Sequence, residues 1–325
     1  MGNRRRALVD AVGGSRERGA AVTTAVCVTG MHRSGTSFVT GALQSLGVSL
    51  GDPDRFMKAG QDNPAGYNEI RAITELDDEV LAQLGGAWDQ PPVLDPGWER
   101  DASLEPFRSR ASDILDEAFG GADDRHELIA WKDPRLSLLL PFWRTVLPIA
   151  TTIAPLRDPM EVIASLGARK YRVDPTQAAS LWLRYVFAAT ANDPGHLVVR
   201  YHDCFDDLAN VLGAIARHLD LPDPDESTIE TARRHLEPSL RHHVSASLPD
   251  AENPLMALAN SVWNGGALDL GAVPSLVADA IAYGWFRGPV DGELLALARA
   301  EVVRVTQTAR RLNRELIRRD AEGEK

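Results

Sequence analysis

The sequence has few cysteines: its 325 residues include only two, Cys27 and Cys204. Two cysteines do not make the disulfide framework on which small secreted domains rely. Cys27 lies in the middle of a predicted strand and Cys204 follows another, so we expect both to be small buried hydrophobes. Cysteine and histidine also show no spacing typical of a metal site, and we expect the protein to work without a metal.

Long apolar runs are missing as well. No segment reaches the ~18 apolar residues that a membrane span requires. The first 20 residues carry several arginines but no continuous apolar stretch, so they do not fit a secretory signal. We interpret residues 1–20 as a disordered basic leader on a cytoplasmic protein. A basic arm that touches a membrane or an acidic partner is the alternative for this segment.

An excess of positive charge is absent too, because the formal net charge is −11. Binding nucleic acid through its phosphates needs a basic surface, so we expect no general affinity for nucleic acid. Any site for a polyanion must then be a local pocket. With 44% hydrophobic and 25% charged residues, the composition is that of a globular protein with a core. The length suits one large domain with an appendage, or two modest domains.

What the sequence does contain is a glycine loop between a strand and a helix, VCVTGMHRSGTS at residues 26–37. Gly30 and Gly35 allow a tight turn that brings backbone N–H groups close to an anion, and a helix beginning near Thr36 points its positive end at the same place. The pattern G-x-x-x-x-G-K-[ST] fits at both glycines and at Ser37, but Thr36 occupies the lysine position. The loop is therefore predicted to bind phosphate without the usual lysine.

Strand-like runs alternate with helix-like runs along most of the chain. Strands are predicted at 25–29, 128–131, 151–155 and 196–203. Helices are predicted from residue 36 and at 68–84, 104–119, 136–146, 160–168, 176–191 and 206–219. This alternation indicates an α/β fold, with a parallel sheet and helices on both of its faces.

The pattern changes towards the C-terminus. We assign residues 21–245 to the α/β domain and residues 246–325 to a helical extension packed on it. A long terminal helix is predicted at 293–319. Packing on its own domain is one interpretation of this helix, and the seam of a homodimer is the other.

Basic and polar residues follow each predicted strand, in the segments HRSGTS, KDPR, LRDP and RYHD. Ligand sites in open α/β sheets lie outside the carboxyl ends of the strands, so these segments should meet at one mouth. The cations that they bring are Arg33, Lys132, Arg135, Arg157 and Arg200. In a chain of net charge −11, such a cluster predicts a pocket for a ligand with several negative groups.

The HRSGTS loop, the segments GYNE and WKDPRL, and R-D-P followed by Ser165 together resemble the bacterial branch of the sulfotransferase family. The resemblance covers about residues 25–243 and implies the P-loop NTPase-like sulfotransferase fold. It also implies 3′-phosphoadenosine 5′-phosphosulfate (PAPS) as donor, the bisphosphate PAP as product and no requirement for a metal. Lys132 would act near the transferring group, and Arg157 and Ser165, eight residues apart, would hold the 3′-phosphate. The residues implied to cradle the 5′-phosphosulfate are Gly30, His32, Arg33, Ser34, Gly35, Thr36 and Ser37.

The sequence departs from the family pattern in two places. Many members carry a lysine in the first loop, whereas here Arg33 takes that role, as in the tyrosylprotein branch. The histidine base of the cytosolic small-molecule branch has no clear counterpart. Glu69 is our candidate for the base, with Asp89 as the second choice, and an acid stabilised by the dipole at a helix start is the alternative role for Glu69. Catalysis is thus expected from Glu69, Lys132 and Arg33.

Two further clusters have open roles. His202 and Asp203 are interpreted as the start of a helix, acting as a cap, in preference to a catalytic role. Arg241, His242 and His243 either close over the nucleotide or form a solvated cluster.

The sequence leads to a main hypothesis and two alternatives. The main one is sulfuryl transfer from PAPS to a hydroxyl of a small metabolite, glycan or lipid-linked acceptor. The alternatives are a P-loop small-molecule kinase and a nucleotide-binding protein without turnover.

Overall fold

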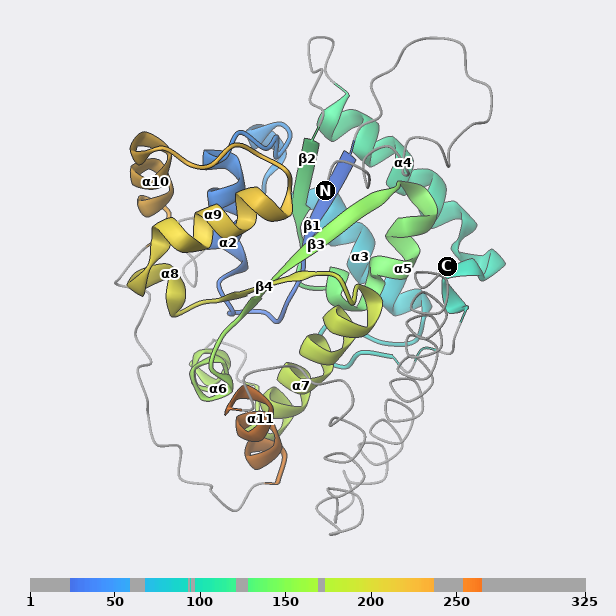
Figure 1. Ribbon diagram of the computed structural model, residues 1–325. Coiled ribbons are helices and arrows are strands. Elements are labelled where there is room, and N and C mark those ends of the chain that lie inside the picture. Colours follow the sequence, from blue (N-terminus) through green and yellow to red (C-terminus); the bar gives the residue numbers. More distant parts are fainter. Residues whose placement is uncertain are drawn as a thin grey trace, which may run out of the picture.

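A computed structural model describes residues 24–58, 68–92, 94, 97–120, 128–168, 173–236 and 254–264 (Figure 1). The predicted leader at 1–20, the cluster Arg241, His242 and His243, and the predicted terminal helix at 293–319 lie outside the described residues. Their roles, including a homodimer seam, stay predictions.

The described part contains one parallel sheet whose four strands lie in the order β2-β1-β3-β4. The strands are β1 (Thr24–Val28), β2 (Leu128–Lys132), β3 (Ile149–Leu156) and β4 (Leu197–Arg200). Val28 at the end of β1 pairs with Lys132 on one side and with Ile153 on the other, and Leu156 pairs with Arg200. The segments that follow these strands therefore meet at one edge, and the predicted parallel α/β fold is confirmed.

Helices cover both faces of the sheet (Figure 1). Side chains alternate along a strand, and in β1 the residues Val26 and Val28 join one buried cluster while Ala25 and Cys27 join the other. The first cluster lies under α2 (Thr36–Ser45), α9 (Leu208–His218) and α10 (Glu226–Arg233). The second lies under α3 (Arg71–Gln83), α4 (Glu105–Phe119), α5 (Leu136–Val146) and α7 (Pro175–Asn192).

Three more helices and three 3-10 turns complete the described part of the chain. They are α6 (Pro159–Gly167), α8 (Asp203–Asp206), α11 (Pro254–Asn264) and the 3-10 turns η1 (Pro53–Arg55), η2 (Trp98–Arg100) and η3 (Ala102–Leu104). Helix α11 packs against α6 and α7, and the three lie together at the bottom of Figure 1. Both Cys27 and Cys204 are buried free thiols, as predicted.

Several predicted boundaries were wrong, and each error has a local cause. The strand predicted at 196–203 ends at Arg200, because the chain turns at Tyr201 and α8 begins at Asp203. His202 precedes α8 but its side chain makes no capping hydrogen bond. The helix predicted from 206 begins at Leu208, since Asp207 accepts a hydrogen bond from the Asn210 N–H as its cap.

The helix predicted from residue 68 also begins later, at Arg71. Asn68 has a positive φ of 51°, which is incompatible with a right-handed helix. With Asn68 in this conformation, Asn68 and Glu69 lie in the segment that leads into α3. Glu69 is therefore outside the helix, and it is not the first-turn acid that the alternative interpretation required.

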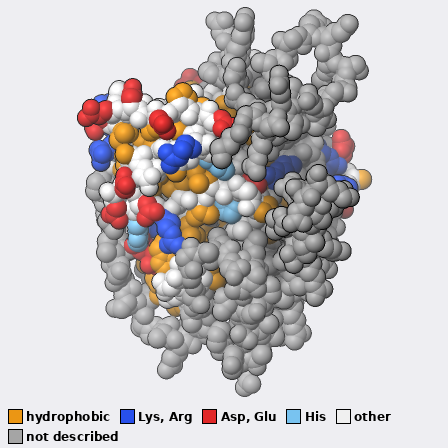
Figure 2. Space-filling view, in the orientation of Figure 1, with side chains coloured by type: hydrophobic (Ala, Val, Ile, Leu, Met, Phe, Trp, Pro, Cys, Tyr) orange, Lys and Arg blue, Asp and Glu red, His pale blue; other side chains and the backbone are white. Residues whose placement is uncertain are grey.

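The described helices include none that is long and apolar enough to cross a membrane. On the face shown in Figure 2, acidic side chains are prominent at the upper left, where Figure 1 places α10. Basic and hydrophobic side chains lie between them, so this part of the surface carries mixed charge.

Candidate functional site

The loop between β1 and α2 is shaped by three residues with positive φ. Gly30 has φ 102°, Arg33 has φ 67° and Gly35 has φ 95°. Successive residues in such mixed conformations turn backbone N–H groups towards one concave side, where an anion is favoured. The loop is anchored on α5, because the Gly30 N–H donates to Ser137 Oγ at 2.8 Å and that hydroxyl is 3.2 Å from the Gly30 carbonyl oxygen.

Gly35 is required by close packing as well as by its conformation. A Cβ atom there would lie 2.3 Å from Cδ2 of Tyr201, the residue after β4. Helix α2 begins directly after Gly35, which has no side chain to cap the first-turn N–H groups. The positive end of α2 is therefore open to an anion held by the loop.

Arg33, Arg157 and Ser165 come together on one side of this loop. The Arg33 Nε–H donates to Ser165 Oγ at 3.0 Å, and an Arg157 Nη1–H donates to the Arg33 carbonyl oxygen at 3.1 Å. Arg157 follows β3 and Ser165 lies on α6, so two elements bring these residues to the loop. The structure thus places together three of the residues that the resemblance assigned to donor binding.

The guanidinium of Arg157 is buried and only partly satisfied. Its Nε–H donates to Glu161 at 2.7 Å, and its Cζ lies 4.7 Å from the centroid of the Tyr201 ring. The Nη2 atom is buried and makes no hydrogen bond within the described part of the chain. A buried N–H group without a partner is costly, and in a site it points to a missing ligand.

Lys132 and Glu69 form a buried ion pair near Ser37, at the helix end of the loop. Lys132 Nζ donates to Glu69 Oε1 and lies 3.5 Å from Ser37 Oγ. The two residues are 2% and 8% exposed. Burial raises the pKa of the Glu69 carboxyl, although the charge of Lys132 opposes this shift. A cation and a carboxylate with a raised pKa therefore lie together at the start of α2.

Arg135, another of the cations that the sequence predicted at this edge, is paired with two carboxylates. Its guanidinium lies 2.6 Å from Asp78 and 3.1 Å from Asp133, so two carboxylates already balance its charge. Arg200 at the end of β4 lies with its Cζ 4.9 Å from the ring centroid of Trp263 on α11. The charge of Arg135 is thus balanced within the protein, although it still acts on the nearby Glu69 carboxyl and opposes the rise in pKa that burial causes there.

His32, a residue of the loop, packs against two aromatic side chains from other parts of the chain. Its ring lies 4.7 Å from Trp88 and 5.4 Å from Tyr185, measured between centroids. The Tyr185 hydroxyl donates to the Trp88 carbonyl oxygen at 2.8 Å, which fixes the loop that carries Trp88. The next residue, Asp89, accepts a hydrogen bond from Gln177 through its backbone oxygen at 3.0 Å.

The other loop residues are mostly buried. Ser34 and Thr36 are 1% and 5% exposed, and the Thr40 hydroxyl donates to the Thr36 carbonyl oxygen at 2.8 Å. Thr36, which occupies the lysine position of the loop pattern, thus sits inside the first turn of α2. Ser37 accepts from Asn68 through its backbone oxygen at 3.3 Å, which ties the Glu69 segment to the loop.

Sequence reasoning missed three residues that build this site. Glu161 binds Arg157, Tyr201 packs on both Gly35 and Arg157, and Ser137 holds Gly30. Glu161 was detectable, because it follows Arg157 by four residues at a predicted helix start. Tyr201 and Ser137 carry no such signal, since only the packing of distant segments brings them to the loop.

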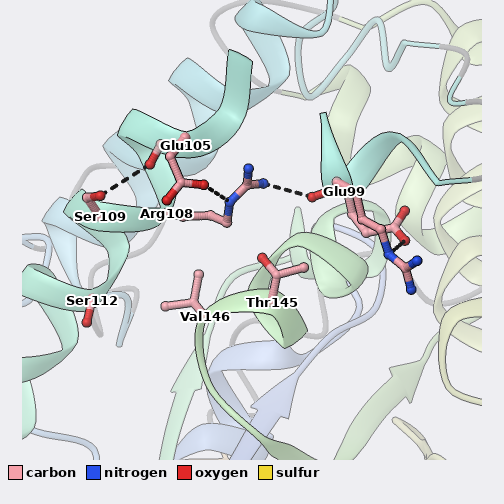
Figure 3. Close-up of a pocket in the computed structure, with 8 residues that line it drawn as sticks. Glu99, Glu105, Arg108, Ser109, Ser112, Thr145 and Val146 are labelled. Atoms are coloured by element: carbon pink, nitrogen blue, oxygen red, sulfur yellow. Dashed lines mark hydrogen bonds and ion pairs between the residues drawn. The ribbon is translucent and has the colours of Figure 1, made fainter. Parts of the chain in front are cut away.

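A separate hollow of about 500 Å³ lies away from the loop (Figure 3). It is lined by residues of η2, α4 and the last turn of α5, including Thr145 and Val146, which precede β3 and so lie towards the opposite edge of the sheet. Arg108, a partly buried cation in its lining, donates to Glu105 at 2.8 Å and to the Glu99 carbonyl oxygen at 2.9 Å. We assign no function to this hollow.

Fold and site together define a class: an α/β protein whose glycine loop and neighbouring cations are built to receive an anion. A family model described as "Sulfotransferase family" matches residues 25–225, which is more than half of the chain. The chain belongs to the sulfotransferase family.

Solved structures with a similar fold come from bacterial sulfotransferases. The sulfotransferase domain of the Synechococcus PCC 7002 olefin synthase is 16% identical with a TM-score of 0.44, covering 77% of this chain and 98% of that one. Sulfotransferase STF1 from Mycobacterium tuberculosis H37Rv is 15% identical with a TM-score of 0.41, covering 76% and 78%. A search of curated protein sequences gave no match. Membership of the family rests on the match over residues 25–225.

Proposed function

We propose that this protein transfers a sulfuryl group from PAPS to a hydroxyl of a small metabolite, glycan or lipid-linked acceptor, in the cytoplasm. The observation that carries the proposal is the buried Nη2 of Arg157, which has no partner among the described residues. Arg157 contacts Arg33 through Nη1, and Arg33 in turn contacts Ser165. A donor with phosphate groups at both its 5′ and 3′ positions needs a second cation beyond the glycine loop. Arg157 is suited to supply it.

The residues present fit such a donor. The loop and the N-terminus of α2 offer backbone N–H groups for the 5′-phosphosulfate, with Gly30, Gly35 and Arg33 setting the backbone conformation. Arg157 and Ser165, which both contact Arg33, would hold the 3′-phosphate. In this proposal the protein groups contact the donor directly, and no metal ion is required between them.

Lys132 and Glu69 would then perform the chemistry. In the transfer, the acceptor oxygen forms a bond to sulfur while the bond from sulfur to the bridging oxygen breaks, and PAP leaves with that electron pair. Lys132 Nζ offsets the negative charge that develops near the transferring group. The acceptor proton passes to a Glu69 carboxylate oxygen, whose raised pKa makes it a better base than an exposed glutamate.

The kinase alternative finds no support in the site. A P-loop kinase needs a loop lysine on the phosphates and an acid that binds Mg²⁺. Thr36 stands in the lysine position, and Asp133, the acid next to Lys132, is fully buried and bound to Arg135. The second alternative is a protein that binds the nucleotide without turnover, and the experiment must distinguish it from a transferase.

The test begins with binding and ends with turnover. PAP and ATP are titrated by calorimetry with and without Mg²⁺, and we expect PAP to bind without metal and more tightly than ATP. The purified protein is then incubated with labelled PAPS and host extract, and all labelled sulfated products are detected without selecting an acceptor in advance. Mg²⁺-dependent ATP binding would favour a kinase instead. PAP binding with no labelled product in a broad panel of hydroxyl acceptors would favour the non-catalytic alternative.

A further inference from the structure

A chain of side-chain contacts continues beyond Arg157 to Glu161 and His202. Glu161 Oε2 accepts from the Arg157 Nε–H at 2.7 Å, and Glu161 Oε1 lies 3.1 Å from His202 Nε2. Glu161 is 3% exposed and follows Arg157 by one turn, near the start of α6. Its two oxygens therefore join the end of β3 to the segment after β4.

The carboxylate determines which edge of the Arg157 guanidinium remains available. Glu161 occupies Nε and the Arg33 carbonyl oxygen occupies Nη1, while the Tyr201 ring covers one face of the group. With these contacts made, Nη2 is the nitrogen left without a partner among the described residues. Rotation of the guanidinium would break two hydrogen bonds, so Glu161 holds Nη2 in a single orientation.

His202 supports Glu161 from the outer side. Its side chain is 29% exposed, and its ring makes an edge contact with Trp263 of α11 at 6.0 Å between centroids. The Glu161 carboxylate is thereby fixed at both oxygens. A simple counter-ion for a buried arginine requires charge alone, whereas this arrangement fixes direction as well.

We propose that Glu161 is a positioning residue, which orients the Arg157 guanidinium for the 3′-phosphate of the donor, with His202 as its outer support. This inference rests on the proposed function, because it takes PAP as the product that Arg157 recognises. It adds a residue that does not touch the donor and acts only through Arg157.

The ratio of PAP affinity to AMP affinity measures the effect directly, because AMP has the 5′-phosphate and lacks the 3′-phosphate. Glu161→Ala should lower this ratio about tenfold, the size of one charge-assisted hydrogen bond, and leave AMP affinity unchanged. Glu161→Gln should keep the ratio within about threefold of wild type, because its amide oxygen still accepts from Nε. Melting temperatures and AMP binding show whether each variant is folded.

A counter-ion role predicts the opposite pattern. Both variants remove the same negative charge, so both would then bind PAP equally and more tightly than the wild type. That result would overturn the positioning role. A wild-type protein that does not prefer PAP to AMP would instead refute the proposed donor, and with it the premise of this inference.

If Glu161→Ala does not fold, His202→Ala decides the question. We expect it to lower the PAP to AMP ratio about two- to threefold, because one of the two supports of Glu161 is lost. His218→Ala is the matched control: His218 is also a partly buried histidine, and its Nε2 lies 2.8 Å from Thr151 Oγ1 near the start of β3. Equal ratios in the two histidine variants would contradict the proposal.

Discussion

At the scale of single residues, Arg157 gives the most direct test of donor recognition. Arg157→Ala removes the buried Nη2 that we assign to the 3′-phosphate. PAP affinity should fall about 10- to 100-fold, as expected for lost hydrogen bonds between charged groups, and the donor KM should rise with little change in kcat. Calorimetry and steady-state kinetics measure both. Arg110→Ala, which breaks an exposed ion pair with Glu79, is the control, and unchanged PAP affinity in the Arg157 variant would remove the assignment.

Glu69 tests the chemical step separately from binding. Glu69→Gln should lower kcat about 10²- to 10⁴-fold, the usual contribution of a general base. PAP binding should be no weaker, because glutamine carries no charge and releases Lys132 from its ion pair. Calorimetry with PAP and initial rates at saturating donor provide the two measurements. Asp89→Asn serves as the comparison, and a fully active Glu69 variant would move the base role to Asp89 or elsewhere.

The pH dependence of the reaction follows from the same carboxyl group. Burial raises the pKa of Glu69, and a base accepts a proton only in its ionised form. The value of kcat/KM should therefore fall as the pH decreases through this raised pKa, at a higher pH than for an exposed glutamate. The residual activity of Glu69→Gln should lack this acidic limb. A wild-type profile that stays flat until the protein unfolds in acid would contradict Glu69 as the base.

Some of these residues were predictable from the sequence, and others were not. Arg33, Arg157 and Ser165 stood out because they follow predicted strands at spacings shared with a known family. The bond between Lys132 and Glu69 joins residues 63 positions apart, and no local pattern encodes such a pairing. The ion pair of Arg135 with Asp78 was likewise not predictable, because Asp78 comes from a helix distant in the sequence.

At the scale of elements, the strand, loop and helix unit around Gly35 depends on a contact as well as on backbone freedom. Gly35→Ala should abolish PAP binding and lower the melting temperature, because a Cβ would lie 2.3 Å from Tyr201 in addition to the cost of φ 95°. Gly47→Ala is the matched control, since Gly47 has φ 83° but no atom within 4 Å of the added Cβ. The control should lose only about 1–2 kcal/mol of stability and retain PAP binding. Equal losses of PAP binding in the two variants would show that the contact with Tyr201 is unimportant.

The elements themselves were more predictable than their ends. Whether a segment forms a strand or a helix depends largely on its own residues. The four strands and the helices between them were therefore predictable from the apolar runs and from the positions of glycine and proline. The end of β4 was placed too late because Tyr201 belongs to the same apolar pattern as the strand. Its ring packs on the loop after β1, and only the tertiary fold reveals that role.

At the scale of the whole molecule, the parallel sheet was predictable from connectivity, because parallel strands need a crossover connection that is usually a helix. The position of the site followed too, because it lies where the strands end. The contacts of α11 did not follow. Its Trp263 comes from a segment more than sixty residues after Arg200 in the chain, yet it packs against that arginine and His202. Long-range packing of this kind leaves no periodic pattern in the sequence.

Charge leads to a prediction for the entire molecule. The chain has a net charge of −11, while Arg33, Lys132 and Arg157 are buried or partly buried around one loop. A nucleotide can enter such a local site, but a long duplex must approach the negative surface. A large excess of double-stranded DNA should therefore leave PAP affinity unchanged at about 150 mM salt, where charges beyond about 8 Å are screened. Competition titrations with a fluorescent PAP analogue measure this, with unlabelled PAP as the positive control. Displacement of the analogue by DNA would instead demonstrate a continuous basic groove leading into the loop.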